Sequence, residues 1–193
     1  MGAQLAQEAL SRGHRVTVVS GPVEEPLPKG ARVIRVETAQ EMEAALRKQA
    51  SAANGIIMAA AVADFRAKRR NQKLTRQGRL TLRLEPVGDI IGRLPKRRGQ
   101  LRAGFALESE KALERATEKL YAKQLDVLVA QQITGHGPFG RNRVRAWLIS
   151  SQGMAGARSV CVKPLGRVSK QRVARELLDK LEQLWYGQPR QKA

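Results

Sequence analysis

Apolar and polar positions alternate along the chain in a way that separates helical from extended segments. Four apolar residues share one helical stripe within residues 2–11, and Gly13 follows where a left-handed C-cap belongs, so this segment is predicted to be a helix. Residues 15–20 and 32–36 are short and rich in β-branched residues, which is typical of strands. Thr38 and Glu41 have the spacing of a capping box, which predicts a helix that continues to Gln49.

The middle of the chain combines a very apolar stretch with a very basic one. Gly55–Ala63 is continuously apolar, which is typical of a strand covered on both faces. Residues 64–71 are polar and basic and are predicted to form a loop. Residues 73–76 and 79–85 alternate around Gln77 and Gly78, which predicts a projecting β-hairpin, an insertion at about residues 72–86.

The second half continues the alternation of helices and strands. Helical periodicity returns at residues 89–94, and Ser109 and Ser169 are candidate N-caps of a helix that runs to Lys123 and of the last helix. Strands are predicted over residues 102–107, 125–130, 143–149 and 158–163. Residues 1–187 therefore form one α/β domain, a Rossmann-like three-layer parallel sheet, and residues 188–193 form a frayed basic tail.

The beginning of the chain does not fit a complete sheet of this class. Such sheets open with a strand whose carboxyl end carries a glycine-rich turn, whereas this chain opens inside a helix. The first strand is therefore expected to be missing. Either it is supplied from elsewhere, or the sequence is a truncated form of a longer parent.

Composition narrows the class of protein further. No apolar run approaches the roughly 18 to 20 residues that cross a bilayer, and no secretory leader pattern opens the chain, which together predict a cytoplasmic protein. A single cysteine, Cys161, excludes an internal disulfide and a multi-cysteine zinc site. The formal net charge of +19 attracts anions, but only 4% of the residues are aromatic. Nucleic-acid binding is therefore kept only as an alternative function.

Candidate binding residues follow the predicted strands, because open parallel sheets bind ligands beyond the carboxyl ends of their strands. Ala59, Ala60 and Ala61 let a flat ligand approach the backbone. The carboxylate of Asp64 can accept hydrogen bonds from a base amine or help to hold a metal ion, or it is an ordinary turn aspartate after a buried strand. Phe105 either packs in the core or stacks on a base.

Three lysines are candidates for binding a polyphosphate. Lys119 and Lys123 lie one helical turn apart, so both ammonium groups can converge on one anion. The alternative is surface ion pairing with Glu114 and Glu118. Lys73 opens the predicted hairpin and is either a third phosphate ligand or a solvated edge lysine.

Six stretches in their order along the chain carry a family resemblance: Met1–Ala6, Arg12–Pro22, Thr38–Met42, Met58–Phe65, Gly104–Glu108 and Lys119–Lys123. Together they resemble the phosphopantothenate-cysteine ligase family, the CTP-dependent synthetase half of the bifunctional flavoprotein of bacterial coenzyme A biosynthesis. The alanine-rich stretch that ends at Asp64 is the most specific of the six.

The resemblance implies a homodimer that condenses 4'-phosphopantothenate with cysteine. CTP converts the acid to an acyl-cytidylate with release of pyrophosphate, the amine of cysteine then displaces CMP, and Mg2+ bridges the phosphates. No flavin, membrane or nucleic acid is expected as a partner. By motif position, Asp64 and Lys73 act in catalysis, and no residue is assigned as a metal ligand. The implied nucleotide site comprises Met58, Ala59, Ala60, Asp64, Lys73, Asp89, Ile90, Ile91, Phe105, Lys119 and Lys123.

The chain also departs from this family. The N-terminal strand and its glycine-rich turn are absent, and Val87–Ile90 stands where the family has Asn-Pro-Asp-Ile. Ala130–Gln132 stands where the family has Ala-Asn-Asp. These differences leave a second hypothesis, a truncated noncatalytic relative that binds nucleotide or mediates dimerisation.

Overall fold

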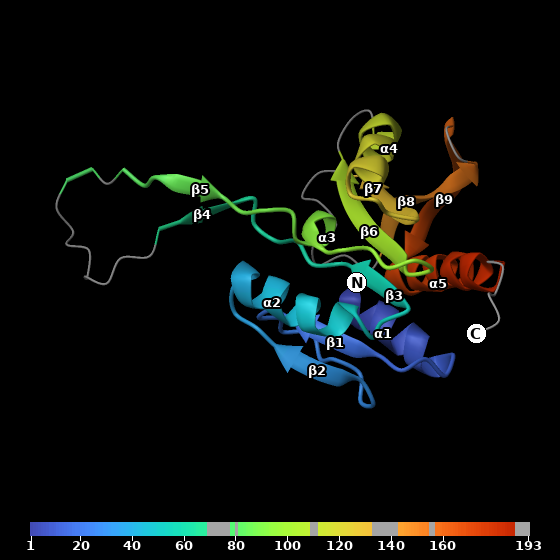
Figure 1. The fold of residues 1–193 in the computed structure, drawn as a ribbon, viewed down its shortest axis with the longest axis horizontal. Helices are drawn as coiled ribbons and strands as arrows, with labels where there is room; N and C mark the ends of the chain where they lie inside the picture. Colours follow the sequence, from blue (N-terminus) through green and yellow to red (C-terminus); the bar gives the residue numbers. More distant parts are fainter. Residues whose placement is uncertain (69–77, 80, 109–111, 133–142, 155–156, 188–193) are drawn as a thin grey trace.

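The computed structural model describes residues 1–68, 78–79, 81–108, 112–132, 143–154 and 157–187. Helices and strands alternate along most of this length (Figure 1). In chain order the elements are α1 (Gly2–Ser11), β1 (Thr17–Ser20), β2 (Arg32–Arg35), α2 (Ala39–Ala50), β3 (Gly55–Met58), β4 (Phe65–Ala67), β5 (Leu84–Pro86), α3 (Ile90–Arg93), β6 (Leu101–Glu108), α4 (Ala112–Ala122), β7 (Val127–Gln132), β8 (Arg143–Met154), β9 (Ala157–Ser169) and α5 (Lys170–Tyr186).

The strands of the described residues form one large sheet and two small ones. The large sheet has the order β3-β6-β7-β8-β9, in which β3, β6 and β7 run parallel and β8 and β9 run antiparallel to their neighbours. β1 pairs with β2 in a separate parallel sheet, and β4 pairs with β5 in an antiparallel ribbon. The predicted α/β class is confirmed, and β3, β6 and β7 have the expected parallel arrangement. The large sheet is mixed and not purely parallel, because β8 and β9 pair antiparallel.

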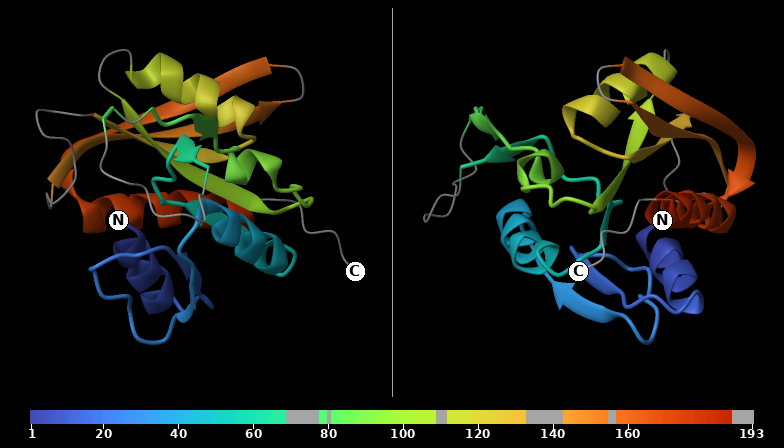
Figure 2. Two further views of the ribbon diagram at one scale, coloured as in Figure 1. Left: turned by 90° about the vertical axis from the view of Figure 1, so that its left-hand side faces the viewer. Right: turned by 45° about the vertical axis from the view of Figure 1, so that its right-hand side comes forward.

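Helices cover both faces of the large sheet (Figure 2). On one face, α1 and α5 pack through Leu5, Val173 and Leu177 against Val127 and Val129 of β7. Leu128 and Ala130, which alternate with those valines, contribute to the core on the other face. That core also contains Ile91 of α3 and Ala116 and Leu120 of α4. β7 is thus apolar on both sides, which is the pattern of a central strand in a three-layer α/β domain. No helix in the described ranges is long and apolar enough to span a bilayer.

Several element boundaries lie where local sequence chemistry places them. Gly13 follows α1 with φ of +82°, a backbone conformation that glycine adopts without strain. The N–H of Arg172 donates to the Oγ of Ser169 at 3.1 Å, so Ser169 caps α5 as predicted. Ser109, the other candidate cap, lies outside the described residues.

The segment after β3 differs from the prediction. The strand predicted over Gly55–Ala63 ends at Met58, and Ala60 and Ala61 are exposed. A run of alanines is apolar, and this pattern predicted a buried strand as far as Ala63. The side chain of alanine is so small, however, that its burial contributes little free energy. Strand β4 begins at Phe65, where a loop was predicted.

The projecting insertion starts earlier in the chain than predicted. Its described stem is the pairing of Phe65–Ala67 with Leu84–Pro86, and in Figure 1 this ribbon extends away from the rest of the molecule. The side chains of Phe65 and Leu84 are both exposed, so the alternation in residues 79–85 does not reflect a buried face. The predicted strand at residues 73–76 lies outside the described residues, as does the tail at 188–193.

The start of α2 gives the first testable prediction. Thr38 and Glu41 form the predicted capping box: the N–H of Glu41 donates to Thr38 Oγ1 at 3.1 Å, and the N–H of Thr38 donates to Glu41 Oε2 at 3.2 Å. We expect Thr38→Ala to lower the free energy of unfolding by about 1 kcal/mol because one helix N–H loses its acceptor. Thermal unfolding measures the change. Thr38→Ser, which keeps the hydroxyl, should be neutral, and equal losses in both variants would contradict this role of the cap.

The amino end of β6 contains a buried arginine, Arg102. The side chain of Arg102 is fully buried, its Nη1 donates to the carbonyl oxygen of Ile91 at 3.2 Å, and its Nε has no hydrogen-bond partner among the described residues. Burial lowers the pKa of the Arg102 guanidinium, and the nearby charge of Asp126 opposes that shift. The positive charge of Arg102 is therefore stabilised mainly by neutral hydrogen-bond acceptors.

We expect Arg102→Met to raise the free energy of unfolding by about 1 to 2 kcal/mol, because a buried charge that forms no salt bridge within the described residues is replaced by an apolar side chain of similar length. Urea denaturation measures the change. Arg47→Met, at an exposed position, is the matched control and should change stability little. A destabilised Arg102→Met variant would show that its hydrogen bonds outweigh the cost of burying the charge.

Candidate functional site

The carboxyl end of β3 lies beside the middle of β6 and brings the first candidate residues together. Met58 is in register with Gly104, so the next residues along the two strands, Ala59 and Phe105, are also neighbours. Met58 packs with the cores that contain Ile90 and Ile91, whereas Ala59 and Phe105 pack against the core on the side of α1 and α5. The candidate residues at the end of β3 and in the middle of β6 therefore lie on both faces of the sheet.

After β3, residues 59–64 form an irregular and mostly exposed segment, which we call the ledge. Ala60, Ala61 and Asp64 are all exposed, and the main-chain oxygen of Asp64 accepts a hydrogen bond from the N–H of Val87 at 2.8 Å. This bond ties the end of the ledge to the segment that leads into α3. Asp64 lies in a bend beyond the end of β3 at Met58 and not directly after a buried strand. Its carboxylate is open to solvent and to a ligand or a hydrated metal ion.

The start of helix α3 lies close to the end of the ledge. Asp89 is the N-cap, and its Oδ1 accepts a hydrogen bond from the N–H of Gly92 at 3.3 Å. Ile90 and Ile91 are each only 3% exposed, so their side chains belong to the core. Any contact that these two isoleucines make with a nucleotide would therefore involve their main-chain atoms.

The end of α4 lies near the amino end of β7 and places a cation beside the start of α3. The N–H of Lys123 donates to the carbonyl of Lys119 at 3.0 Å, which continues the helical turn past Ala122. Lys123 Nζ lies 3.3 Å from Asp89 Oδ2. This pair joins α3 to α4, and sequence reasoning missed it because the two residues are far apart in the chain and each had a nearer candidate role.

Gln131 and Lys73 also concern the candidate site. Gln131, near the end of β7, is buried, and in the part of the chain that the structure describes its Nε2 has no hydrogen-bond partner. It stands where the family resemblance would place an asparagine, and that departure was the only signal in the sequence. Lys73, which was predicted to face the triphosphate, lies outside the described residues.

The ledge, the start of α3 and the end of α4 together carry groups suited to binding a nucleoside triphosphate. The exposed alanine ledge can take a flat base, the ammonium group of Lys123 can take an anion, and Asp64 supplies an exposed carboxylate. Mg2+ in proteins is typically held by one or two carboxylates together with substrate phosphates, so Asp64 fits such an ion. In the described ranges no three His, Cys, Asp or Glu side chains cluster as a metal site, so the phosphates would supply the remaining ligands.

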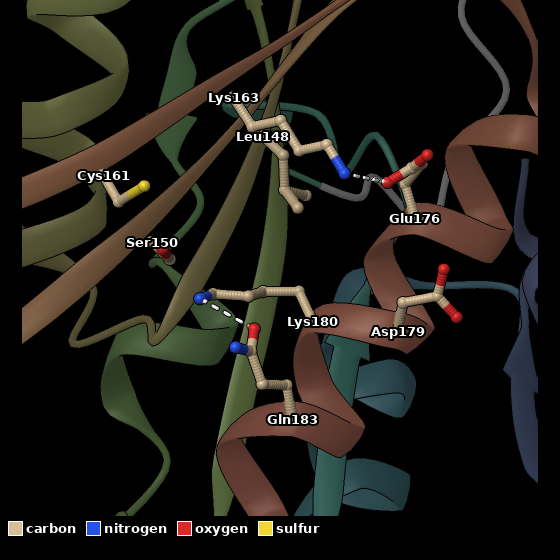
Figure 3. A pocket seen from close by; sticks show the side chains of 8 residues that line it. All are labelled: Leu148, Ser150, Cys161, Lys163, Glu176, Asp179, Lys180 and Gln183. Atoms are coloured by element: carbon tan, nitrogen blue, oxygen red, sulfur yellow. Dashed lines mark hydrogen bonds and ion pairs between the residues drawn. The ribbon is translucent and has the colours of Figure 1, made fainter. Parts of the chain in front are cut away.

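A separate cavity of about 360 Å³ lies between α5 and the strands β8 and β9 (Figure 3). Lys163 Nζ donates to Glu176 Oε2 at 2.7 Å, and Lys180 Nζ donates to Gln183 Oε1 at 3.2 Å. None of the predicted site residues lines this cavity. Because these polar groups pair with one another, the sheet edge remains the better candidate site.

A mixed open sheet between two layers of helices defines an α/β domain. The family model described as the DNA/pantothenate metabolism flavoprotein C-terminal domain matches residues 1–184. The chain belongs to this family.

Known proteins that resemble the chain agree with this assignment. The coenzyme A biosynthesis bifunctional protein CoaBC of Borreliella burgdorferi is 35% identical over 184 residues, which cover 92% of this chain and 44% of that protein. The crystal structure of the C-terminal domain of a CoaBC has a TM-score of 0.77 at 29% identity and covers 97% of this chain and 83% of that one. A mutant of Cab2 in complex with phosphopantothenate-cysteine has a TM-score of 0.66 at 16% identity, covering 95% and 77%, which shows a shared fold. The chain spans less than half the length of the curated relatives that it matches.

Proposed function

We propose that this domain is a CTP-dependent phosphopantothenate-cysteine ligase of coenzyme A biosynthesis. The observation that carries the proposal is the chain of contacts from the ledge to α4: the main chain of Asp64 bonds to that of Val87 before α3, and Asp89 at the start of α3 lies 3.3 Å from Lys123 at the end of α4. Membership of the pantothenate-metabolism family supports it, as does the product complex of a protein with the same fold.

In the proposed reaction, the carboxylate of 4'-phosphopantothenate attacks the α-phosphorus of CTP, and the bond to pyrophosphate breaks. The amine of cysteine then attacks the acyl carbon, the bond to CMP breaks, and the amine loses a proton. Lys73, Lys119 and Lys123 bind the triphosphate and stabilise the charge on the departing pyrophosphate. Bound Mg2+ would add charge neutralisation between the phosphates.

The same proposal assigns the base of CTP to the ledge. Met58, Ala59 and Ala60 line it, Asp64 contacts the nucleotide, and Phe105 lies beside Ala59 at the register of the two strands. The main chain at Asp89, Ile90 and Ile91 completes the pocket. We also propose a homodimer on the basis of the family resemblance, and the cytoplasmic location remains a prediction from the sequence.

Isothermal titration of the chain with CTP and Mg2+ tests the binding step, and a pyrophosphate-release assay with 4'-phosphopantothenate and cysteine tests the reaction. We expect saturable heat with CTP and release of pyrophosphate only when 4'-phosphopantothenate is present. Binding of CTP without pyrophosphate release would support the alternative of a noncatalytic nucleotide-binding relative. Absence of heat at millimolar CTP, together with a salt-sensitive affinity for nucleic acid, would favour the nucleic-acid alternative.

A further inference from the structure

Two arginines lie opposite each other on the last two strands of the large sheet. Arg145 of β8 is in register with Arg167 of β9, and residues opposite each other in an antiparallel pair project from the same face of the sheet. Both residues are exposed. Their Cβ atoms are therefore about 5 Å apart, a spacing at which two like charges destabilise the pairing of the strands.

A third arginine lies beside this pair. Arg143 is exposed and precedes Arg145 by two residues, so both side chains project from the same face of β8. Nη2 of Arg143 donates to the carbonyl oxygen of Arg167 at 2.8 Å. We call Arg143, Arg145 and Arg167 the arginine face.

The arginine face lacks a neutralising carboxylate in the part of the chain that the structure describes. None of its three side chains forms an ion pair within the described ranges. The residue in register with Arg145 on its other side is Gln132 of β7, which is neutral. Residues 133–142, which connect β7 to β8 along the chain, contain no aspartate or glutamate and add Arg141. An anion from outside the chain would relieve the repulsion between these charges.

The aromatic residue next to this pair is covered by one of the arginines. Cζ of Arg145 lies 5.7 Å from the centroid of the Trp147 ring, a distance at which the face of an indole attracts a cation. A guanidinium group that stacks on a ring can still direct its N–H groups to an anion. The ring face beneath Arg145 is not available to stack on a base, so the arginine face is suited to a phosphate group rather than to a nucleobase.

We propose that Arg145 and Arg167 form a binding site for the terminal phosphate group of a phosphate monoester. Each guanidinium group has a planar fork of N–H donors that matches two phosphate oxygens. Two such forks fit a terminal phosphate, which has three non-bridging oxygens and a charge of about −2 at neutral pH. A phosphate diester of a nucleic-acid backbone has only two non-bridging oxygens and a single charge, so it satisfies the two forks less well.

This site is separate from the proposed nucleotide site. Gln132 and Arg145 lie at the carboxyl end of β7, whereas Lys123 lies near its amino end. Because β7 has six residues, its two ends are about 16 Å apart. The inference therefore does not depend on the proposed ligase reaction, and the two sites can be tested separately.

NMR titration of the whole chain with sodium phosphate, at neutral pH and constant ionic strength, tests the site through the arginine Nε–Hε signals. We expect saturable shifts at Arg145 and Arg167 with a dissociation constant on the order of 1 mM, as for two hydrogen bonds between charged groups. Arg35, which is exposed on β2, is the internal control and should not shift. Equal shifts at all three arginines, or shifts at Arg145 and Arg167 that do not saturate, would overturn the proposal.

A comparison of two organic phosphates tests the class of ligand. Glycerol phosphate is a monoester with a terminal phosphate, and dimethyl phosphate is a diester with a single charge. We expect glycerol phosphate to bind as inorganic phosphate does and dimethyl phosphate to bind about tenfold more weakly, the effect of one hydrogen bond between charged groups. Equal binding of the two compounds would contradict a site for a terminal phosphate and would favour a nucleic-acid backbone as the ligand.

Substitutions distinguish a defined site from the general attraction of a basic chain for anions. We expect Arg167→Ala to weaken phosphate binding at Arg145 about tenfold, because one guanidinium group is lost. Gln132→Glu keeps both arginines and places a carboxylate opposite Arg145, so an internal ion pair should weaken phosphate binding as well. Arg35→Ala and Lys123→Ala each remove one positive charge elsewhere and should leave phosphate binding at Arg145 unchanged. Equal affinity in all four variants, or an equal loss in all four, would overturn the proposal.

Discussion

Replacing Lys123 by alanine is expected to weaken CTP binding by about tenfold to a hundredfold, the effect of losing one hydrogen bond to a charged group. The position of Lys123 beside α3 is fixed by an ion pair, since its Nζ lies 3.3 Å from Asp89 Oδ2. A triphosphate near Asp89 would draw this ammonium group into contact with its oxygens. Isothermal titration in the presence of Mg2+ measures the change.

Lys180→Ala on α5 is the matched control, because Lys180 lines the separate cavity beside β8 and β9. It removes the same charge from the protein and so corrects for the general attraction of a basic chain for an anion. We expect it to bind CTP as the unmodified chain does. If both variants lose affinity equally, the effect is a long-range field and Lys123 is not a ligand of the triphosphate.

Leu120→Ala is expected to lower the free energy of unfolding by about 3 kcal/mol, within the range observed for a fully buried leucine. Leu120 is completely buried in the core beneath α4, together with Ala116 and Leu125. Its loss would open a cavity under the helix that presents Lys119 and Lys123. Urea denaturation measures the loss, and titration with CTP below the unfolding transition shows whether the site loosens as well.

Leu113→Ala on the same helix provides the comparison. Leu113 is 39% exposed, so its truncation should cost less than about 1 kcal/mol. A similar loss in the two variants would mean that intrinsic helix stability, rather than packing on the sheet, holds α4. In that case the position of Lys123 would not depend on the core.

Local chemistry in the sequence was enough to predict many boundaries of the fold. Gly13 ends α1, the Thr38 capping box begins α2 and Ser169 caps α5, because each signal acts over only a few residues. The direction of the last two strands of the sheet could not be predicted in this way. Parallel and antiparallel strands have the same alternation of side chains, and only the pairing of β8 with β7 and β9 distinguishes them.

The roles of the candidate site residues remain predictions. Sequence reasoning placed Asp64 directly after a strand, by the rule that ligands bind beyond the carboxyl ends of parallel strands, whereas β3 ends at Met58. The burial of Ile90 and Ile91 and the pairing of Asp89 with Lys123 depend on how α3 packs against α4. Contacts of this kind join residues distant in sequence, and no pattern along the chain encodes them.

A crystal structure of the chain with CTP and Mg2+ tests the proposed site most directly. The account predicts that the cytidine lies on the ledge at Ala59 and Ala60, with the triphosphate directed toward the end of α4 and within reach of Lys123. A nucleotide bound in the cavity between α5 and β9, or a ledge that stays empty at saturating CTP, would contradict it.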